Sequence, residues 1–434
     1  MASSDHIYKV DDYSKNIQRR CSEILDLPPS CIEFVPREKS STTDPTDSDN
    51  YFIVGTYHLQ ASASIEPIEV PTDEDNDDDE EPSSLPKPQE RNGSLNLFNL
   101  RENKLTLVER IPYPAGILDF HFIPHRQIFA VASSTGCISF YRTTSSPAGE
   151  KDLGKTIKHM TTHQIFPPDI LVLSLTWVPT TKESQIPMLV TTINTGEVHL
   201  IKFSNWEFEG YEILNDEMPI YRHDAEAWIA AVCPSLKHVY TGGDDIQLQI
   251  MEANLKEINE DPAVEAEFTS SVKVRGHDAG ITAILPLPFL ENRMFLTGSY
   301  DDTIRLYTIS PGRPARLLYD FKLGGGVWRL KFLEEHSLAK EAEGALKWRI
   351  LASCMHAGAK ILELDFDGDQ SWKITEVGYV KEHKSMNYAS DVQPLMPSCG
   401  NDGQLDSVKE RLVVSTSFYD KLLVVWTYDP QFSI

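Results

Sequence analysis

The sequence predicts an all-β fold, and within that class a closed β-propeller of seven blades. Self-similarity at a fixed spacing is the first of three observations behind this prediction. The segment "ITAILPLPFLENRMFLTGSYDDTIRLYTI", which begins at Ile281, returns in outline from Trp228 and again from Val327. Each copy has a short apolar strand, a turn, an apolar strand that ends in small residues, a tight turn and an alternating strand.

Alternation and the number of copies are the other two observations. Ile304 and Leu306 place apolar side chains at every second position, which is typical of a strand packed against neighbouring sheets. Fainter copies begin at residues 117, 171 and 388, and a seventh is assembled from "CIEFVP", "YFIVGTYHL" and "LNLFNL" near the N-terminus. Seven units at this spacing predict seven blades.

We expect residues 1–434 to form one domain, because a closed repeat ring can hold a chain of this length. The N-terminal strands are expected to close the ring against the last blade. Three insertions interrupt the repeats: a disordered acidic loop at 61–92 in the first blade, a helical insertion at 333–348 in blade 6, and a loop at 394–410 in blade 7. The acidic run "DEDNDDDEE" (73–81) repels itself and cannot be buried.

The composition restricts the kind of ligand. The formal net charge is −25, which disfavours a nucleic-acid backbone and suits a cationic ligand or a basic protein. The six cysteines form no CxxC pair, so we expect reduced thiols rather than disulfides or a metal site. The N-terminus lacks the apolar segment of a signal peptide, and no stretch approaches about 18 apolar residues. These features predict a cytoplasmic monomer without membrane contact.

Loops and turns from different blades gather on one face of a propeller, around its central channel. Aligned through the strand that follows, the turns "TGGDD", "TGSYD", "SCMHA" and "TSFYD" place four residues at equivalent positions: Asp244, Tyr300, His356 and Phe418. This alignment predicts that residues far apart in the sequence share one rim.

A bracing network of hydrogen bonds is expected in blade 5. His277, Ser299 and Asp301 match the ordinary WD-repeat pattern, in which a loop histidine, a serine and a turn aspartate satisfy one another's polar groups. Blade 6 has Ala357 where the bracing aspartate is expected. His356 is therefore predicted to stand outside this network.

A free imidazole beside a channel can transfer protons near pH 7, so His356 is a candidate general base. The alternative is a packed or merely exposed histidine. Cys354 stands where blade 5 has Gly298, and it is either a nucleophile or a small buried apolar residue.

Aromatic residues crowd the same predicted face. Acidic residues accompany them, and such a mixture suits a quaternary ammonium group through cation–π contacts. Arg329 lies on an inner strand where Ala231 and Ala283 occupy the matching places, and it could bind a carboxylate. The aromatic candidates are Trp228, Tyr300, Trp328, Tyr388, Phe418 and Tyr419, and the acidic ones are Glu226, Asp244 and Asp420.

Three common catalytic motifs are absent from the sequence. It contains no GxSxG, HExxH or GxGxxG. The three glycines at 324–326 could offer backbone N–H groups to an oxyanion, or they could form a plain flexible loop.

The motifs of blades 4 to 7 resemble those of one family. "EAWIAA", "GGDD", "TGSYD", "GGVWR", "CMHAG" with "KIL", and "SFYD" occur in this order, over roughly residues 220–427. Together they resemble the diphthine methyl ester hydrolases, WD-repeat enzymes of diphthamide biosynthesis. The resemblance implies removal of a methyl ester from over-methylated diphthine on elongation factor 2, and it implies no cofactor.

The resemblance gives the candidate residues a shared role. His356 would act as general base, on water or on the side chain of Cys354 or Ser417, while Asp244 would orient it or hold the ammonium group. These roles come from position alone. The residues expected to bind substrate are Glu226, Trp228, Tyr300, Trp328, Arg329, Phe418, Tyr419 and Asp420.

Other functions compete with this one. Most propellers are binding platforms, so fold alone favours a non-enzymatic scaffold. The same aromatic and acidic residues would also serve a reader of methylated lysine. A metal mechanism that uses His223, Glu226, His277 and His356 has no supporting ligand spacing.

Overall fold

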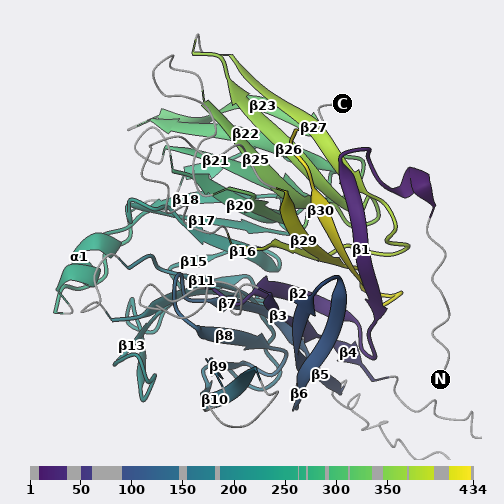
Figure 1. Ribbon diagram of the computed structural model, residues 1–434. Helices are drawn as coiled ribbons and strands as arrows, with labels where there is room; N and C mark the ends of the chain where they lie inside the picture. Colours follow the sequence, from purple (N-terminus) through teal and green to yellow (C-terminus); the bar gives the residue numbers. More distant parts are fainter. Residues whose placement is uncertain are drawn as a thin grey trace, which may run out of the picture.

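The computed structural model contains seven antiparallel sheets, and each sheet is one blade of a closed ring (Figure 1). The predicted seven-bladed propeller is therefore confirmed. The described residues are 9–36, 50–60, 90–145, 154–180, 186–261, 263–269, 272–288, 293–310, 313–334, 346–368, 371–394 and 410–431.

Blades 1 to 4 follow one another along the chain, each from its inner to its outer strand. Blade 1 is β2 (Pro29–Phe34), β3 (Tyr51–Thr56), β5 (Arg91–Arg101) and β6 (Lys104–Tyr113), with β4 (His58–Leu59) beside the start of β5. Blade 2 is β7 (Ile117–Phe122), β8 (Ile128–Ser133), β9 (Cys137–Ser145) and β10 (Lys155–Gln164). Blade 3 is β11 (Val172–Trp177), β12 (Met188–Ile193), β13 (Glu197–Phe203) and a divided outer strand, β14 (Tyr211–Ile213) and β15 (Tyr221–Arg222). Blade 4 is β16 (Ala227–Val232), β17 (His238–Gly243), β18 (Leu248–Glu252) and β19 (Val272–Val274).

Blades 5 to 7 complete the ring. Blade 5 is β20 (Ile281–Leu287), β21 (Met294–Ser299), β22 (Thr303–Ser310) and β23 (Arg313–Lys322). Blade 6 is β24 (Arg329–Phe332), β25 (Leu346–Ser353), β26 (Ala359–Phe366) and β27 (Trp372–Val380). Blade 7 is β28 (Ala389–Val392), β29 (Arg411–Thr416), β30 (Leu422–Tyr428) and β1 (Ile17–Ile24).

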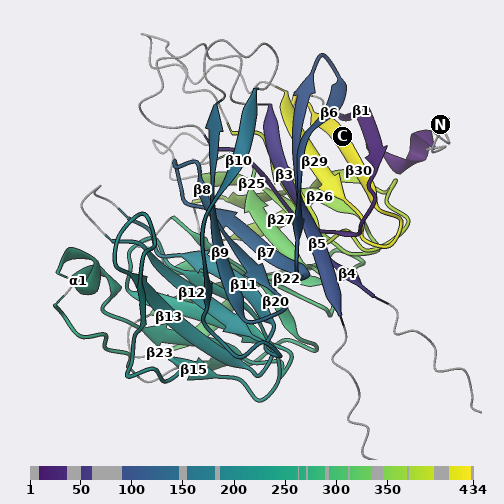
Figure 2. The same ribbon diagram turned by 90° about the horizontal axis from the view of Figure 1, so that it is seen from below.

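The N-terminal strand closes the ring, as the sequence predicted. The strand β1 follows a 3-10 turn at Val10–Asp12 and pairs antiparallel with β30, so its purple ribbon lies beside the yellow C-terminal strand in Figure 1. Figure 2 shows the same neighbourhood from below, with β6 also close to β1. One blade is therefore built from both ends of the chain.

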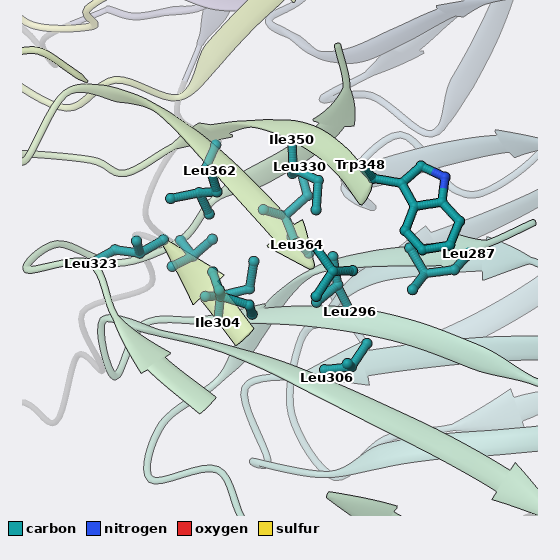
Figure 3. Close-up of a cluster of buried hydrophobic side chains, with 14 of the residues drawn as sticks. Leu287, Leu296, Ile304, Leu306, Leu323, Leu330, Trp348, Ile350, Leu362 and Leu364 are labelled. Carbon is teal, nitrogen blue, oxygen red and sulfur yellow. The ribbon is translucent and has the colours of Figure 1, made fainter. Parts of the chain in front are cut away.

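The core is divided among the seams between blades. Seven buried apolar clusters are found in the described residues, and each combines side chains of two successive blades. Figure 3 shows the cluster between blades 5 and 6, where Leu296 and Ile304 face Ile350 and Leu362. Inner strands are buried on both faces because each blade packs against two neighbours. Functional side chains are thus confined to strand ends and to the axis of the ring.

The predicted insertions fall largely outside the described residues, namely at 61–89, 335–345 and 395–409. Two of their boundaries were wrong. The acidic insertion ends before β5, because Arg91 and Asn92 pair with β4. The segment predicted to be helical ends before β25, because residues 346–348 pair with β26.

A short helix that the sequence did not predict, α1 (Leu255–Glu260), lies between β18 and β19. Leu255 and Ile258 pack into the seam between blades 3 and 4, which explains its amphipathic sequence. No helix within the described ranges is long and apolar enough to cross a membrane.

Candidate functional site

Two positions in each blade define the face on which the candidate site lies. The turn position lies one or two residues after the end of the second strand, in the turn that follows it, for example Tyr300 in blade 5 and Phe418 in blade 7. The rim position lies two residues after the carbonyl that precedes the inner strand. In blades 2 to 5 the N–H of the turn residue donates to the carbonyl that precedes the inner strand. The distances are 3.0 Å from Ser134 to Gly116, 3.1 Å from Asn194 to Leu171, 2.8 Å from Asp244 to Glu226, and 3.0 Å from Tyr300 to Gly280.

The rim positions follow from the strand register. In blades 4 and 5 the rim residue is the one that bulges out of the pairing between the first two strands. Trp228 occupies this position in blade 4, Trp328 in blade 6 and Tyr388 in blade 7, whereas blade 5 has the small Thr282. Three of four successive blades therefore present an aromatic ring at the same height.

Aromatic rings from both positions form a continuous row, which we call the aromatic arc. Neighbouring ring centroids are 6.2 Å apart from Tyr57 to Phe418, 5.5 Å to Tyr388, 4.9 Å to Trp328 and 5.7 Å to Tyr300. Trp228 lies 5.6 Å from Trp328 and 6.2 Å from Tyr300, with its ring steeply inclined to both. All six residues are half-buried, so each keeps part of its surface for a ligand. The arc runs from blade 4 through blade 7 to blade 1.

Two carboxylates lie at one end of the aromatic arc. The indole N–H of Trp228 donates to Asp244 Oδ1 at 3.2 Å, and Asp244 is exposed. Burial raises the pKa of Tyr300, and the negative charges of Asp244 and Glu226 act in the same direction. Asp244 Oδ1 and Tyr300 Cδ2 both lie close to Gly280, at 2.4 Å and 3.2 Å from the place that a Cβ would take there. Negative charge beside inclined aromatic faces suits a quaternary ammonium group.

Arg329 lies just below the arc. Its guanidinium carbon is 5.4 Å from the centre of the Trp328 ring, and its Nη1 donates to the carbonyls of Trp328 (3.2 Å) and Thr282 (3.5 Å). The register matches Arg329 with Ala283 in blade 5, as expected, but with Ile229 rather than Ala231 in blade 4. A partly exposed cation thus lies next to the aromatic arc.

The predicted position of His356 was wrong by one residue. Gly298 pairs with Ile304 in blade 5, and Ser353 pairs with Ala359 in blade 6, so both turns span the same number of residues. Met355 therefore takes the place of Tyr300, and His356, not Ala357, stands where blade 5 has Asp301. His356 is exposed and forms no hydrogen bond with the described residues.

The geometry contradicts three of the predicted roles. Cys354 matches Ser299 rather than Gly298, it is fully buried, and burial raises its pKa to about 12, which disfavours a nucleophilic thiolate. Ser417 is also buried, and its hydroxyl donates to Asp420. Asp420 accepts a further bond from the N–H of Lys384 (3.1 Å), so it braces blade 7 instead of facing a ligand.

The expected bracing in blade 5 takes a slightly different form. His277 Nε2 lies 2.9 Å from Thr297 Oγ1 rather than bonding to Ser299, and Asp301 accepts from the N–H of Asp278 at 2.9 Å. Burial lowers the pKa of His277 to about 4, so its imidazole is neutral. This histidine is therefore structural.

The glycine run at 324–326 has a packing explanation. A methyl group on Gly325 would lie 2.3 Å from the carbonyl oxygen of Cys354, and one on Gly326 would lie 2.6 Å from Met355 Sδ. The chain approaches the blade 6 turn too closely for any side chain there. Tyr419, by contrast, is 69% exposed; its ring lies 5.0 Å from that of Phe418 at the outer end of the arc, and its N–H donates to Ser385 Oγ at 2.9 Å.

A row of alternating charges below the arc was missed by the sequence analysis. We call it the charge ladder, and it crosses the axis of the ring between inner strands of four blades. Arg329 Nη2 is 3.6 Å from Asp119 Oδ1, and Asp119 Oδ2 is 3.3 Å from His121 Nε2. His121 Nδ1 is 2.7 Å from Glu33 Oε1, which is 3.4 Å from Lys331 Nζ. The ladder ends at Asp391 Oδ1, 3.0 Å from Lys331 Nζ.

The ladder keeps its central groups ionised. Burial alone would lower the pKa of His121, but the charges of Asp119 and Glu33 outweigh it and raise the pKa to about 10. Burial would raise the pKa of Asp119, yet His121, Arg329 and the N–H of Leu175 bring it down to about 2. The sequence does contain a signal for the charge ladder. Charged residues occupy alternate positions of inner strands that are otherwise apolar.

The described residues hold neither a metal-binding cluster nor a disulfide. No group of three or more His, Cys, Asp and Glu side chains suited to a metal is found in the part of the chain that the structure describes. The five cysteines within that part are free thiols.

We predict that His121 remains an imidazolium at about pH 8, because its two carboxylate neighbours hold the proton. Ring-nitrogen chemical shifts in NMR spectra would measure this, with the neutral His277 as an internal reference. The pKa of His121 is about 10 in the folded state and 6.5 ordinarily. The contacts of His121 therefore contribute their full stabilisation to the folded protein below pH 6.5, and this contribution is lost as the pH rises through 10. A His121 titration midpoint near 6.5 would contradict the ladder.

Comparison with known proteins supports the resemblance found in the motifs. No protein-family model matches the chain. The chain is 27% identical over 412 residues to "Diphthine methyltransferase" of Schizosaccharomyces pombe, which covers 91% of this chain and 98% of the yeast protein. Proteins of the same name from Saccharomyces cerevisiae (26% identity, 77% of this chain, 88% of that protein) and Homo sapiens (28%, 64% and 56%) also match.

A solved structure supports the fold alone. A chain of the "Crystal Structure of Mitotic Checkpoint Complex" aligns with 99% of this chain and 97% of its own length, at a TM-score of 0.53 and 12% identity. The family resemblance rests on the sequence comparisons, whose extent matches that of the whole ring. The chain is thus a relative of the proteins named diphthine methyltransferase, as the motifs of blades 4 to 7 predicted.

Proposed function

We propose that this protein acts in diphthamide biosynthesis and hydrolyses the methyl ester of methylated diphthine on elongation factor 2. Water and the ester give the diphthine carboxylate, a proton and methanol. The proposal is supported by the relatives, which share the name diphthine methyltransferase, and by the chemistry of the face that carries the aromatic arc. We expect the reaction to take place in the cytoplasm, with a monomer as the enzyme.

The juxtaposition of the aromatic arc and Arg329 is the observation that carries the proposal. Methylated diphthine has a trimethylammonium group and a carboxyl ester in one side chain. Trp228, Trp328 and Tyr300, with Asp244 close by, suit the ammonium group. Arg329, 5.4 Å from the Trp328 ring, suits the ester carbonyl and then the product carboxylate. One site would therefore bind both halves of the substrate.

His356 would serve as the general base in this reaction. Its exposed imidazole takes a proton from water, and the water oxygen attacks the ester carbonyl carbon. Arg329 stabilises the negative charge that develops on the carbonyl oxygen. The tetrahedral intermediate then releases the methoxy group, which takes the proton from His356 and leaves as methanol. Water is the preferred nucleophile, because the side chains of Cys354 and Ser417 are buried.

A second candidate function follows from the printed name of the relatives. A methyltransferase would move a methyl group onto diphthine, in the opposite chemical sense, and would need a methyl donor. A scaffold or a reader of methylated ammonium groups would bind through the same arc without chemical change. The following assay separates these functions.

We predict that the purified protein removes one methyl group from elongation factor 2 that carries methylated diphthine. Mass spectrometry of the modified peptide would show the loss, and the reaction in heavy-oxygen water would place the label in the diphthine carboxylate. The matched reaction contains unmethylated diphthine and S-adenosylmethionine. A gain of a methyl group there, or binding without any mass change, would refute the hydrolase proposal.

We further predict that His356→Gln lowers the rate of hydrolysis by about 100-fold or more, because general-base catalysis is lost. The substrate KM should change little, since His356 lies outside the aromatic arc. His159→Gln, which alters an exposed histidine on the outer strand β10, is the matched control and should keep full activity. Normal turnover by a folded His356→Gln variant would exclude this histidine as the base.

A further inference from the structure

Arg329 lies near the axis of the ring, and few protein groups hold its guanidinium in place. Its side chain is 16% exposed, and its hydrogen bonds come from Nη1 alone, to the carbonyls of Trp328 and Thr282. No hydrogen bond from Nε or Nη2 forms with the described residues. The flat guanidinium therefore keeps donors for a ligand, and something else must fix its direction.

Asp119 is the only acidic partner of Arg329 within the described residues, and it reaches across the axis from the inner strand β7 of blade 2. Its side chain is 2% exposed, so it has almost no freedom of its own. One of its oxygens faces Arg329, while the other accepts the N–H of Leu175 at 3.1 Å and lies 3.3 Å from His121. Asp119 is thus a rigid carboxylate whose charge points toward Arg329.

The rest of the charge ladder fixes Asp119 in turn. His121 is held between Asp119 and Glu33, and Glu33 accepts the N–H of Phe122 at 2.8 Å. Lys331, two residues after Arg329 on β24, contacts Glu33 from the other side. The contacts that fix Asp119 thus pass through blades 2 and 1 and return at Lys331 to β24, the strand that carries Arg329.

We propose that Asp119 is a positioning residue, which directs the free N–H groups of Arg329 toward the carboxyl end of a ligand whose ammonium end lies on the aromatic arc. This inference deepens the proposed function and rests on it for the identity of the natural ligand. The chemical class that the site recognises is a zwitterion with a quaternary ammonium group and a carboxylate. An ammonium ligand without a carboxylate uses only half of the site.

Glycine betaine and choline test this directly, because both carry the trimethylammonium group and only betaine carries a carboxylate. Affinities would be measured by calorimetry or by ligand-observed NMR on the full chain. We expect Arg329→Gln to weaken betaine binding about tenfold to a hundredfold and to leave choline binding within about twofold. Asp119→Asn should weaken betaine binding about threefold to tenfold, and the double variant should be no weaker than Arg329→Gln.

Two further variants keep the test decisive. Asp391→Asn removes a buried carboxylate at the far end of the ladder, and it should leave the preference for betaine unchanged. Arg329→Lys keeps the positive charge but cannot reach Asp119 and a ligand together, so it should lose the preference even if Asp119→Asn does not fold. Equal binding of betaine and choline by the wild type, or an unchanged preference in Asp119→Asn or Arg329→Lys, would overturn the proposal.

The outcome is separable from that of the hydrolase assay. If the betaine preference depends on Asp119 and Arg329 while methylated diphthine is not hydrolysed, the positioning role stands and the proposed reaction fails. If hydrolysis proceeds and Asp119→Asn retains wild-type KM for the ester substrate, the reaction stands and the positioning role is wrong. A purely structural role for Asp119 would lower stability without changing the ratio of betaine to choline affinity.

Discussion

Closure of the ring is the constraint on which the candidate site depends. The pairing of β1 with β30 makes the last blade complete, and the cluster that joins blades 7 and 1 then buries Phe34 and Phe52 against Val414 and Val425. Because this seam is closed, the ring of Tyr57 reaches that of Phe418, and Glu33 approaches Lys331. The aromatic arc crosses the seam, and the charge ladder has members on both sides of it, Glu33 in blade 1 and Asp391 in blade 7. A ring opened there would lose the end of the arc and the centre of the ladder together.

The arrangement is also strongly asymmetric around the axis. Aromatic rings occupy the turn or rim positions of blades 4 to 7 and of blade 1, whereas blades 2 and 3 have Leu118, Ser134, Leu173 and Asn194 there. Blade 2 contributes below the rim instead, through the carboxylate of Asp119 and the imidazolium of His121. Aromatic faces therefore lie on one side of the axis and the Arg329 guanidinium lies beneath them, an arrangement that suits a molecule with two different polar groups.

The sequence predicted the fold because the repeat dictates it. A strand such as "DTIRLYTI" can bury both faces only between two similar sheets. Seven such units satisfy this requirement for every sheet when they form a closed ring. It also identified Trp228, Trp328, Tyr300 and Arg329, since each is an unusual residue at a repeated position. Tyr57 escaped notice because its blade is interrupted, so its turn could not be aligned with the others.

Other features were out of reach for physical reasons. The exact register of the blade 6 turn depends on backbone pairing. Met355 and Gly358 adopt positive φ angles in this turn, whereas Ile246 and Asp302 do so in the turns of blades 4 and 5. The burial of Ser417 beneath Asp420, like the contact of Asp119 with Arg329, depends on tertiary structure. Residues that are about 200 positions apart in the chain become partners only across the axis, so no local sequence pattern predicts their contact.

The central claim is that one site binds the two polar groups of diphthine, with the ammonium on the aromatic arc and the carboxyl group at Arg329. A crystal structure of the protein with a peptide that carries diphthine would test this most directly. The account predicts electron density for the trimethylammonium group against Trp228, Tyr300 and Trp328, and for the carboxylate within hydrogen-bond distance of Arg329. A peptide bound elsewhere, or one whose carboxylate points away from Arg329, would contradict it.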